Sequence, residues 1–147
     1  MTALARSGKS PWVLLVDDDR IAARGTARLL SGALGARVSI VPSADSALRL
    51  VAGAREVPAA IVLDFELGAS STGVDLLTKL REGGFRGPCA FATGAPARAT
   101  AALRGSRFPD DSPVFEKGDV DGALVAWLGS ALGEPGAHTS GVRRKAF

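Results

Sequence analysis

The sequence is poor in cysteine and in long hydrophobic runs. Its one cysteine, Cys89, cannot form an internal disulfide, and its apolar surroundings predict a buried structural thiol. No apolar stretch approaches the roughly 20 residues that a membrane-spanning helix needs. Residues 1–10 also lack the long apolar run of a secretory signal. We therefore expect a cytoplasmic protein that does not bind a membrane.

Aromatic residues and clustered charge are scarce too, which argues against nucleic-acid binding. Aromatics make up 5% of the chain, the net charge is +3, and the arginines are scattered. The hydrophobic fraction of 46% and charged fraction of 22% are typical of a globular protein. We expect one domain at residues 11–132, between a flexible arm at residues 1–10 and a disordered tail at residues 133–147.

Short apolar segments alternate with amphipathic ones along this domain. The apolar segments predict five strands, at Trp12–Val16, Val38–Val41, Ala59–Leu63, Pro88–Ala92 and Val114–Phe115. The amphipathic segments predict helices at Arg20–Leu34, Ser43–Gly53, between Thr72 and Gly83, Ala95–Leu103 and Asp119–Leu132, with Ile21 among the buried positions of the first. This alternation predicts an α/β fold, with a parallel sheet covered by helices on both faces.

Polar side chains follow four of the predicted strands. Asp17 and Asp18 follow the first, Asp64 the third, Thr93 the fourth and Lys117 the fifth. Because the carboxyl ends of parallel strands meet at one edge of a sheet, we expect these groups to converge. Clustered carboxylates repel one another and therefore call for a cation, and an all-oxygen site suits magnesium.

These residue types suit the transfer of a phosphoryl group to a carboxylate. Asp64 can attack phosphorus as a nucleophile. Magnesium held by Asp18 and Asp64 would neutralise the phosphoryl oxygens. Thr93 and Lys117 could bind the remaining oxygens through hydrogen bonds.

The order and spacing of these groups resemble the receiver domain of two-component response regulators. The resemblance covers about residues 11–132 and rests on Val16-Asp17-Asp18-Asp19, Leu63-Asp64, Ala92-Thr93 and Glu116-Lys117. It implies a flavodoxin-like receiver fold, in which five helices flank a five-stranded parallel sheet of order 2-1-3-4-5.

The resemblance also implies a role for each matching residue. Asp64 matches the phosphoacceptor, Asp18 a direct ligand of Mg²⁺ or Mn²⁺, Asp17 its acidic neighbour, Glu66 the residue whose backbone carbonyl completes the metal site, Thr93 the switch hydroxyl and Lys117 the lysine that pairs with the phosphate. The phosphoryl donor would be a sensor histidine kinase or a histidine phosphotransfer protein. Catalysis would be limited to self-phosphorylation and self-dephosphorylation, so we do not expect an enzyme with other substrates.

We expect a stand-alone receiver, because residues 133–147 are too few for a DNA-binding output domain. It would then be a phosphoprotein, and its phosphorylated form would signal by contacting an unidentified output protein or by forming a homodimer. Arg20, Arg24 and Arg28 recur every four residues and so share one helix face. That face is either simply solvated or a docking surface for an acidic phosphodonor.

Departures from the receiver pattern keep a second hypothesis open. Leu67-Gly68 stands where the family commonly has Met-Pro, and Gly118 replaces the proline that usually follows the lysine, often through a cis peptide. The usual switch aromatic is replaced by Val114, with Phe115 next to it. These differences favour a binding module that keeps the fold but signals without phosphorylation. The Glu66 side chain is either a solvent-facing acid or a carboxylate that tunes the site.

A third hypothesis is a phosphatase of the haloacid-dehalogenase type. Asp17 would be its nucleophile, Asp19 its acid and Lys117 its phosphate-binding cation. The sequence shows no segment that could cover a substrate and no later acidic pair, which argues against it. Asp17 and Asp18 could also act simply as helix-capping acids.

Overall fold

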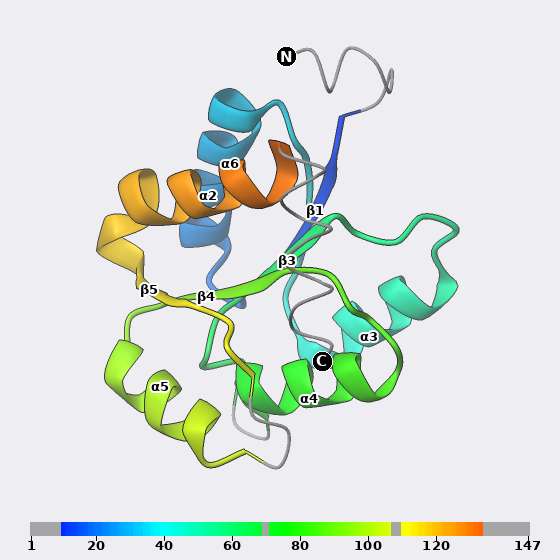
Figure 1. Ribbon diagram of the computed structural model, residues 1–147, viewed down its shortest axis with the longest axis vertical. Coiled ribbons are helices and arrows are strands. Elements are labelled where there is room, and N and C mark those ends of the chain that lie inside the picture. Colours follow the sequence, from blue (N-terminus) through cyan, green and yellow to red (C-terminus); the bar gives the residue numbers. More distant parts are fainter. Residues whose placement is uncertain (1–9, 69–70, 107–109, 134–147) are drawn as a thin grey trace.

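The computed structural model describes residues 10–68, 71–106 and 110–133. They form a parallel sheet with helices packed on both faces (Figure 1). The strands are β1 (Trp12–Val16), β2 (Arg37–Val41), β3 (Ala60–Leu63), β4 (Cys89–Thr93) and β5 (Val114–Glu116). Their order, β2-β1-β3-β4-β5, confirms the predicted topology. The predicted arm and tail lie outside the described residues except for residues 10 and 133.

Five α-helices of the described part of the chain flank the sheet, as predicted. They are α2 (Arg20–Leu34), α3 (Ala44–Gly53), α4 (Gly73–Glu82), α5 (Pro96–Arg104) and α6 (Val125–Gly133). Helices α2 and α6 cover one face of the sheet, and α3, α4 and α5 cover the other (Figure 1). None of the described helices combines the length and the apolar character needed to cross a membrane.

The last helix starts later than predicted. Residues Lys117–Asp119 form a 3₁₀ turn and Val120–Leu124 a π-helical turn before α6 begins. Gly118 and Gly122 lie in this stretch, and each glycine costs an α-helix about 1 kcal/mol relative to alanine. The expected α-helix from Asp119 is therefore wrong for its first two turns.

Strand β4 is shifted by one residue from its predicted bounds. Pro88 has no N–H to donate to a strand ladder, so it cannot be an ordinary member of a central strand. Its carbonyl still accepts a hydrogen bond from the Ile61 N–H, at 3.0 Å. The strand accordingly begins at Cys89 and carries Thr93 within it rather than after it.

The two faces of the sheet bury separate hydrophobic clusters. Along β1, Leu14 packs into the cluster on the α3–α5 side, and Val13 packs into the cluster on the α2–α6 side. Successive residues of a strand point to opposite faces. Because helices cover both faces of this sheet, both side chains are fully buried. This explains why the central strands are continuous apolar runs without polar alternation.

The prediction that Ile21 is buried is wrong, because its side chain is 84% exposed. In α2, Ala23 and Leu30 face the sheet and are fully buried. Ile21 precedes Ala23 by two residues, which is more than half a helical turn. The helix therefore carries Ile21 toward solvent, beside the exposed Arg20 and Arg24.

Cys89 is a buried free thiol, as predicted, with 2% of its surface exposed. Burial raises its pKa to about 12. Because the thiolate is the reactive form, we expect Cys89 to resist an aromatic disulfide reagent in the folded protein and to react fully in urea. Absorbance of the released thiol measures this, and rapid labelling of the folded protein would contradict the buried position.

Candidate functional site

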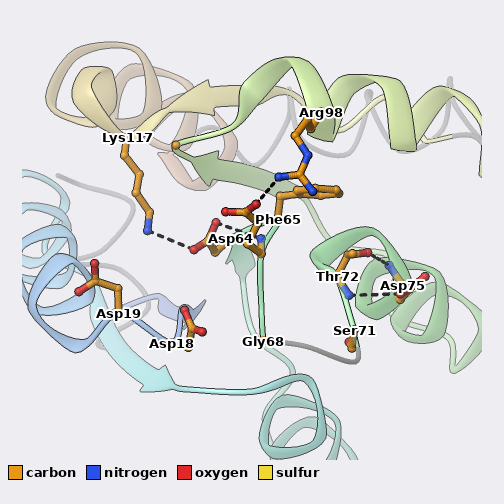
Figure 2. Close-up of a pocket in the computed structure, with 12 residues that line it drawn as sticks. Asp18, Asp19, Asp64, Phe65, Gly68, Ser71, Thr72, Asp75, Arg98 and Lys117 are labelled. Atoms are coloured by element: carbon orange, nitrogen blue, oxygen red, sulfur yellow. Dashed lines mark hydrogen bonds and ion pairs between the residues drawn. The ribbon is translucent and has the colours of Figure 1, made fainter.

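The carboxyl edge of the sheet gathers most of the predicted site residues. Asp18, Asp64 and Lys117 line one pocket there, although they come from the ends of three different strands (Figure 2). Asp17, Asp18 and Asp64 each offer a carboxylate oxygen, and these three oxygens lie within 4.8 Å of one another. Residues far apart in the sequence thus converge as the strand pattern predicted.

Lys117 joins the two buried carboxylates of this group. Its Nζ lies 3.0 Å from Asp17 Oδ2 and 3.1 Å from Asp64 Oδ2. The side chains of Asp17 and Asp64 are only 5% and 8% exposed. Burial raises the pKa of Asp17 above its ordinary value, in spite of opposing contributions from the Asp19 N–H and Lys117. Burial alone would lower the pKa of Lys117, but its bonds to Asp17 and Asp64 outweigh burial and raise it, so the lysine is charged at neutral pH.

Backbone N–H groups orient both buried carboxylates. The Asp19 N–H donates to Asp17 Oδ1 at 2.9 Å, and the Glu66 N–H donates to Asp64 Oδ1 at 3.3 Å. Asp19 is the N-cap of α2, because its own Oδ1 accepts from the Ala22 N–H. The helix-capping role considered for Asp17 and Asp18 therefore belongs to Asp19.

The group of three aspartates could hold a metal ion. Mg²⁺ prefers oxygen ligands at 2.0–2.1 Å, so two of its ligand atoms can be about 4 Å apart. One carboxylate oxygen from each of Asp17, Asp18 and Asp64 lies within 4.8 Å of the other two, which is near this spacing. Asp18 is exposed, so an ion could enter from solvent and keep several waters. The role of the Glu66 backbone carbonyl as a further ligand stays a prediction.

Gly73 fixes the backbone that carries Asp64. Its N–H donates to the Phe65 carbonyl at 2.7 Å, which holds the start of α4 against the end of β3. A Cβ at this position would lie 2.2 Å from the Asp64 carbonyl oxygen and 2.9 Å from the Phe91 ring. Only glycine permits this close approach, and sequence reasoning had not singled it out.

The same turn is fixed by a capping box. Thr72 Oγ1 accepts from the Asp75 N–H, and the Asp75 carboxylate accepts from the Thr72 N–H, both at 3.2 Å. The Thr72-x-x-Asp75 pattern is a known signature of a helix start, and it agrees with the helix predicted between Thr72 and Gly83.

Thr93 differs from the other predicted site residues in its surroundings. Its side chain is fully buried, and its Oγ1 accepts a hydrogen bond from the Ala95 N–H at 3.0 Å. The described residues that line the pocket include its neighbour Gly94 but not Thr93 itself. A phosphate-binding role of Thr93 therefore stays a prediction that requires the loop before α5 to move.

Arg98 is a pocket residue that the sequence did not reveal. It extends from α5 to the segment that follows β3 (Figure 2). There it forms an ion pair with the Glu66 carboxylate, and its guanidinium carbon lies 5.5 Å from the centre of the Phe65 ring. Glu66 is therefore an acid paired with a cation at the pocket, and not an isolated carboxylate beside the site.

The position of the usual switch aromatic is occupied differently. Val114 packs against the cluster on the α3–α5 side of the sheet, whereas Phe115 packs with the opposite cluster. The Phe115 and Trp127 rings lie 6.2 Å apart between centroids, at an interplanar angle of 52°. The aromatic side chain of β5 thus contacts α6, not α5. The Lys117–Gly118 peptide is trans, as expected without proline.

No family model matches the sequence, and no curated protein matches it either. Many solved structures do match its fold, and response regulator receiver domains recur among them. One is the signal receiver domain of an HD domain-containing protein from Pseudomonas fluorescens Pf-5, with 25% identity and a TM-score of 0.71, covering 84% of this chain and 95% of that chain.

Two further matches have the same level of similarity. The receiver domain of NtrX from Brucella abortus shows 26% identity and a TM-score of 0.67, with 82% of this chain and 97% of that chain covered. A sensor protein from Polaromonas sp. JS666 shows 26% identity and a TM-score of 0.72, with 84% and 97% covered. The chain therefore has the fold of response regulator receiver domains.

Proposed function

We propose that this chain, which has the receiver fold, accepts a phosphoryl group on Asp64 and signals through contacts with other proteins. The observation that carries the proposal is the position of the Lys117 ammonium between Asp17 and Asp64, next to the exposed Asp18. A cation and a group of carboxylates at the carboxyl edge of a parallel sheet are the groups that phosphoryl transfer to an aspartate requires.

In the proposed reaction, an Asp64 carboxylate oxygen forms a bond to phosphorus. The bond between phosphorus and the donor's imidazole nitrogen breaks, and its electron pair stays on the imidazole. Magnesium bound by Asp17, Asp18 and Asp64 would neutralise the phosphoryl oxygens. Lys117 already lies 3.1 Å from Asp64 Oδ2, so it can pair with an oxygen of the transferred group.

The phosphodonor would be a sensor histidine kinase or a histidine phosphotransfer protein. Helix α2 offers a surface for it, where Arg20, Arg24 and Arg28 are exposed and Ile21 adds an apolar contact beside them. Cations at the rim of an interface mainly speed association with an acidic partner. The chain's own catalysis would be limited to its self-phosphorylation and self-dephosphorylation.

The proposal is tested by incubation with acetyl phosphate and Mg²⁺, followed by intact mass measurement. We expect the wild-type protein to gain the mass of one phosphoryl group, and Asp64→Asn to gain none. EDTA should also prevent the gain. An equal gain in Asp64→Asn would contradict Asp64 as the acceptor.

The phosphorylation-independent binding module remains the second candidate. Val114 stands at the switch position of β5, where the family usually has a rotating aromatic. Phe115, the aromatic residue of β5, contacts Trp127 in α6 instead. This candidate predicts no mass gain in wild type, with unchanged partner binding by Asp64→Asn. The phosphatase hypothesis has less support, because its proposed acid Asp19 is engaged as the N-cap of α2.

A further inference from the structure

Arg98 stands apart from the other described residues of the site because it is a cation at the pocket whose ion-pair partner is exposed. Its side chain is 67% exposed and that of its partner Glu66 is 56% exposed. An exposed ion pair contributes little net stability, so the cost of separating the two side chains is small. The pair can therefore exchange partners without disturbing the fold.

The charge balance of the pocket favours such an exchange. Among its described lining residues are five carboxylates, at Asp18, Asp19, Asp64, Glu66 and Asp75, and two cations, Lys117 and Arg98. Lys117 is already held by two carboxylates. An anionic phosphoryl donor entering this pocket meets repulsion, and Arg98 is the cation whose present partner lies at the surface.

We propose that Arg98 binds the phosphodonor: its guanidinium leaves Glu66 and takes a non-bridging oxygen of the phosphoryl group as the donor enters. This inference rests on the proposed function and adds to it a residue that selects an anionic donor. An arginine–phosphate contact is charge-assisted and can use two parallel hydrogen bonds. It is therefore at least as strong as the exposed ion pair of Arg98 with Glu66.

Phe65 holds the Arg98 guanidinium near the pocket while its hydrogen-bond partner changes. The Arg98 guanidinium lies over the Phe65 ring, and a cation–π contact of this kind holds the group near the ring while its hydrogen-bond partner changes. Phe65 follows Asp64 directly, and the Glu66 N–H donates to Asp64 Oδ1. Phe65, whose ring contacts Arg98, and Glu66, its present ion-pair partner, are thus the two residues that follow Asp64 in the chain.

With acetyl phosphate as donor, the transfer needs no further reactant. An Asp64 oxygen forms the new bond to phosphorus, the bond from phosphorus to the acyl oxygen breaks, and acetate leaves with the electron pair. Arg98 keeps all its protons and changes only its hydrogen-bond partner. Glu66 is left solvated at the surface.

The test compares second-order rate constants for phosphorylation by acetyl phosphate with Mg²⁺, followed by intact mass. We expect Arg98→Ala to react about fivefold more slowly, the size of effect of one exposed charge contact. Glu66→Gln should react about two- to fivefold faster, because it frees Arg98. The double variant should match Arg98→Ala, and Arg98→Lys should recover part of the rate.

Arg104→Ala is the matched control, since it removes the same exposed charge from the far end of α5. It should react like the wild type. A merely structural ion pair predicts that Arg98→Ala and Glu66→Gln change the rate in the same direction, and that result would overturn the inference. A gain from Glu66→Gln that persists without Arg98 would overturn it too, because Glu66 would then act through its own charge.

The same measurement distinguishes the role of Arg98 from the proposed function. A wild-type protein that gains no phosphoryl group overturns both. A wild-type protein that is phosphorylated, with single variants that change in the same direction, overturns only the role of Arg98.

Discussion

Gly73→Ala is expected to lower the free energy of unfolding by about 3 kcal/mol, at the upper end of the cost of overpacking. The new Cβ would lie 2.2 Å from the Asp64 carbonyl oxygen, and backbone cannot yield as a flexible side chain can. Relief requires the end of β3 or the start of α4 to move, so Asp64 is displaced. A displacement of about 1 Å can slow a reaction on the order of 100-fold, and phosphorylation should fall accordingly. Urea unfolding followed by circular dichroism measures the first effect, and intact mass the second.

Gly25→Ala provides the matched control in helix α2. A Cβ there would have no neighbour within 4 Å, so the substitution should stabilise the protein by about 1 kcal/mol through helix propensity. Nothing in the structure explains why Gly25 is glycine. Ordinary surface substitutions change the free energy of unfolding by no more than about 0.5 kcal/mol. If the free energy of unfolding of Gly73→Ala differs from that of the wild type by no more than this, the close approach of α4 to Asp64 is refuted.

Magnesium is expected to stabilise the wild-type protein by about 2.7 kcal/mol at a concentration 100-fold above its dissociation constant. Two carboxylates of the acidic group are buried and share one lysine, so a divalent cation relieves their repulsion. Thermal unfolding with EDTA and with increasing Mg²⁺ measures the effect. Asp18→Asn should remove most of it, because it takes away an exposed ligand without disturbing the buried pair.

Glu116→Gln is the control for this experiment, because it removes an exposed acid next to Lys117 that is not one of the three clustered aspartates. It should keep the full stabilisation by Mg²⁺. Melting temperatures that do not depend on Mg²⁺ in the wild type, or that rise equally in Asp18→Asn, would contradict the metal site.

The stabilisation should also depend on pH. Burial raises the pKa of Asp17 above 3.8, so in the window above 3.8 the folded protein binds more protons than the unfolded chain. Without metal, the contribution of Asp17 to stability therefore grows as the pH falls through its raised pKa and is lost as the pH rises. Protons and Mg²⁺ compete for the same carboxylate, so the effect of Mg²⁺ should be smaller at mildly acidic than at neutral pH.

The fold and the centre of the site follow from local rules that this chain obeys. Strands β1 and β3 are buried on both faces, so their sequences are unbroken apolar runs that end at Asp17 and Asp64. Once the strands are known to be parallel, those ends must share an edge, and Lys117 after β5 joins them. The convergence needed no knowledge of side-chain contacts.

Features that depend on tertiary contacts could not be predicted in the same way. Ile21 looked like a core position, but the sheet contacts set the rotation of α2 and turn Ile21 to solvent. Arg98 resembles any exposed arginine in an alanine-rich helix until the fold brings it to Glu66. Gly73 reads as an ordinary loop glycine, because the backbone it must approach belongs to another element.

The most direct measurement locates the phosphoryl group on the chain. The wild-type protein is phosphorylated with acetyl phosphate and Mg²⁺, reduced with borohydride, digested and mapped by peptide mass spectrometry. Borohydride converts an aspartyl phosphate to homoserine, and we predict homoserine at position 64 alone. Homoserine at position 17 would identify Asp17 as the nucleophile, and a chain without homoserine would contradict phosphoryl acceptance by Asp64.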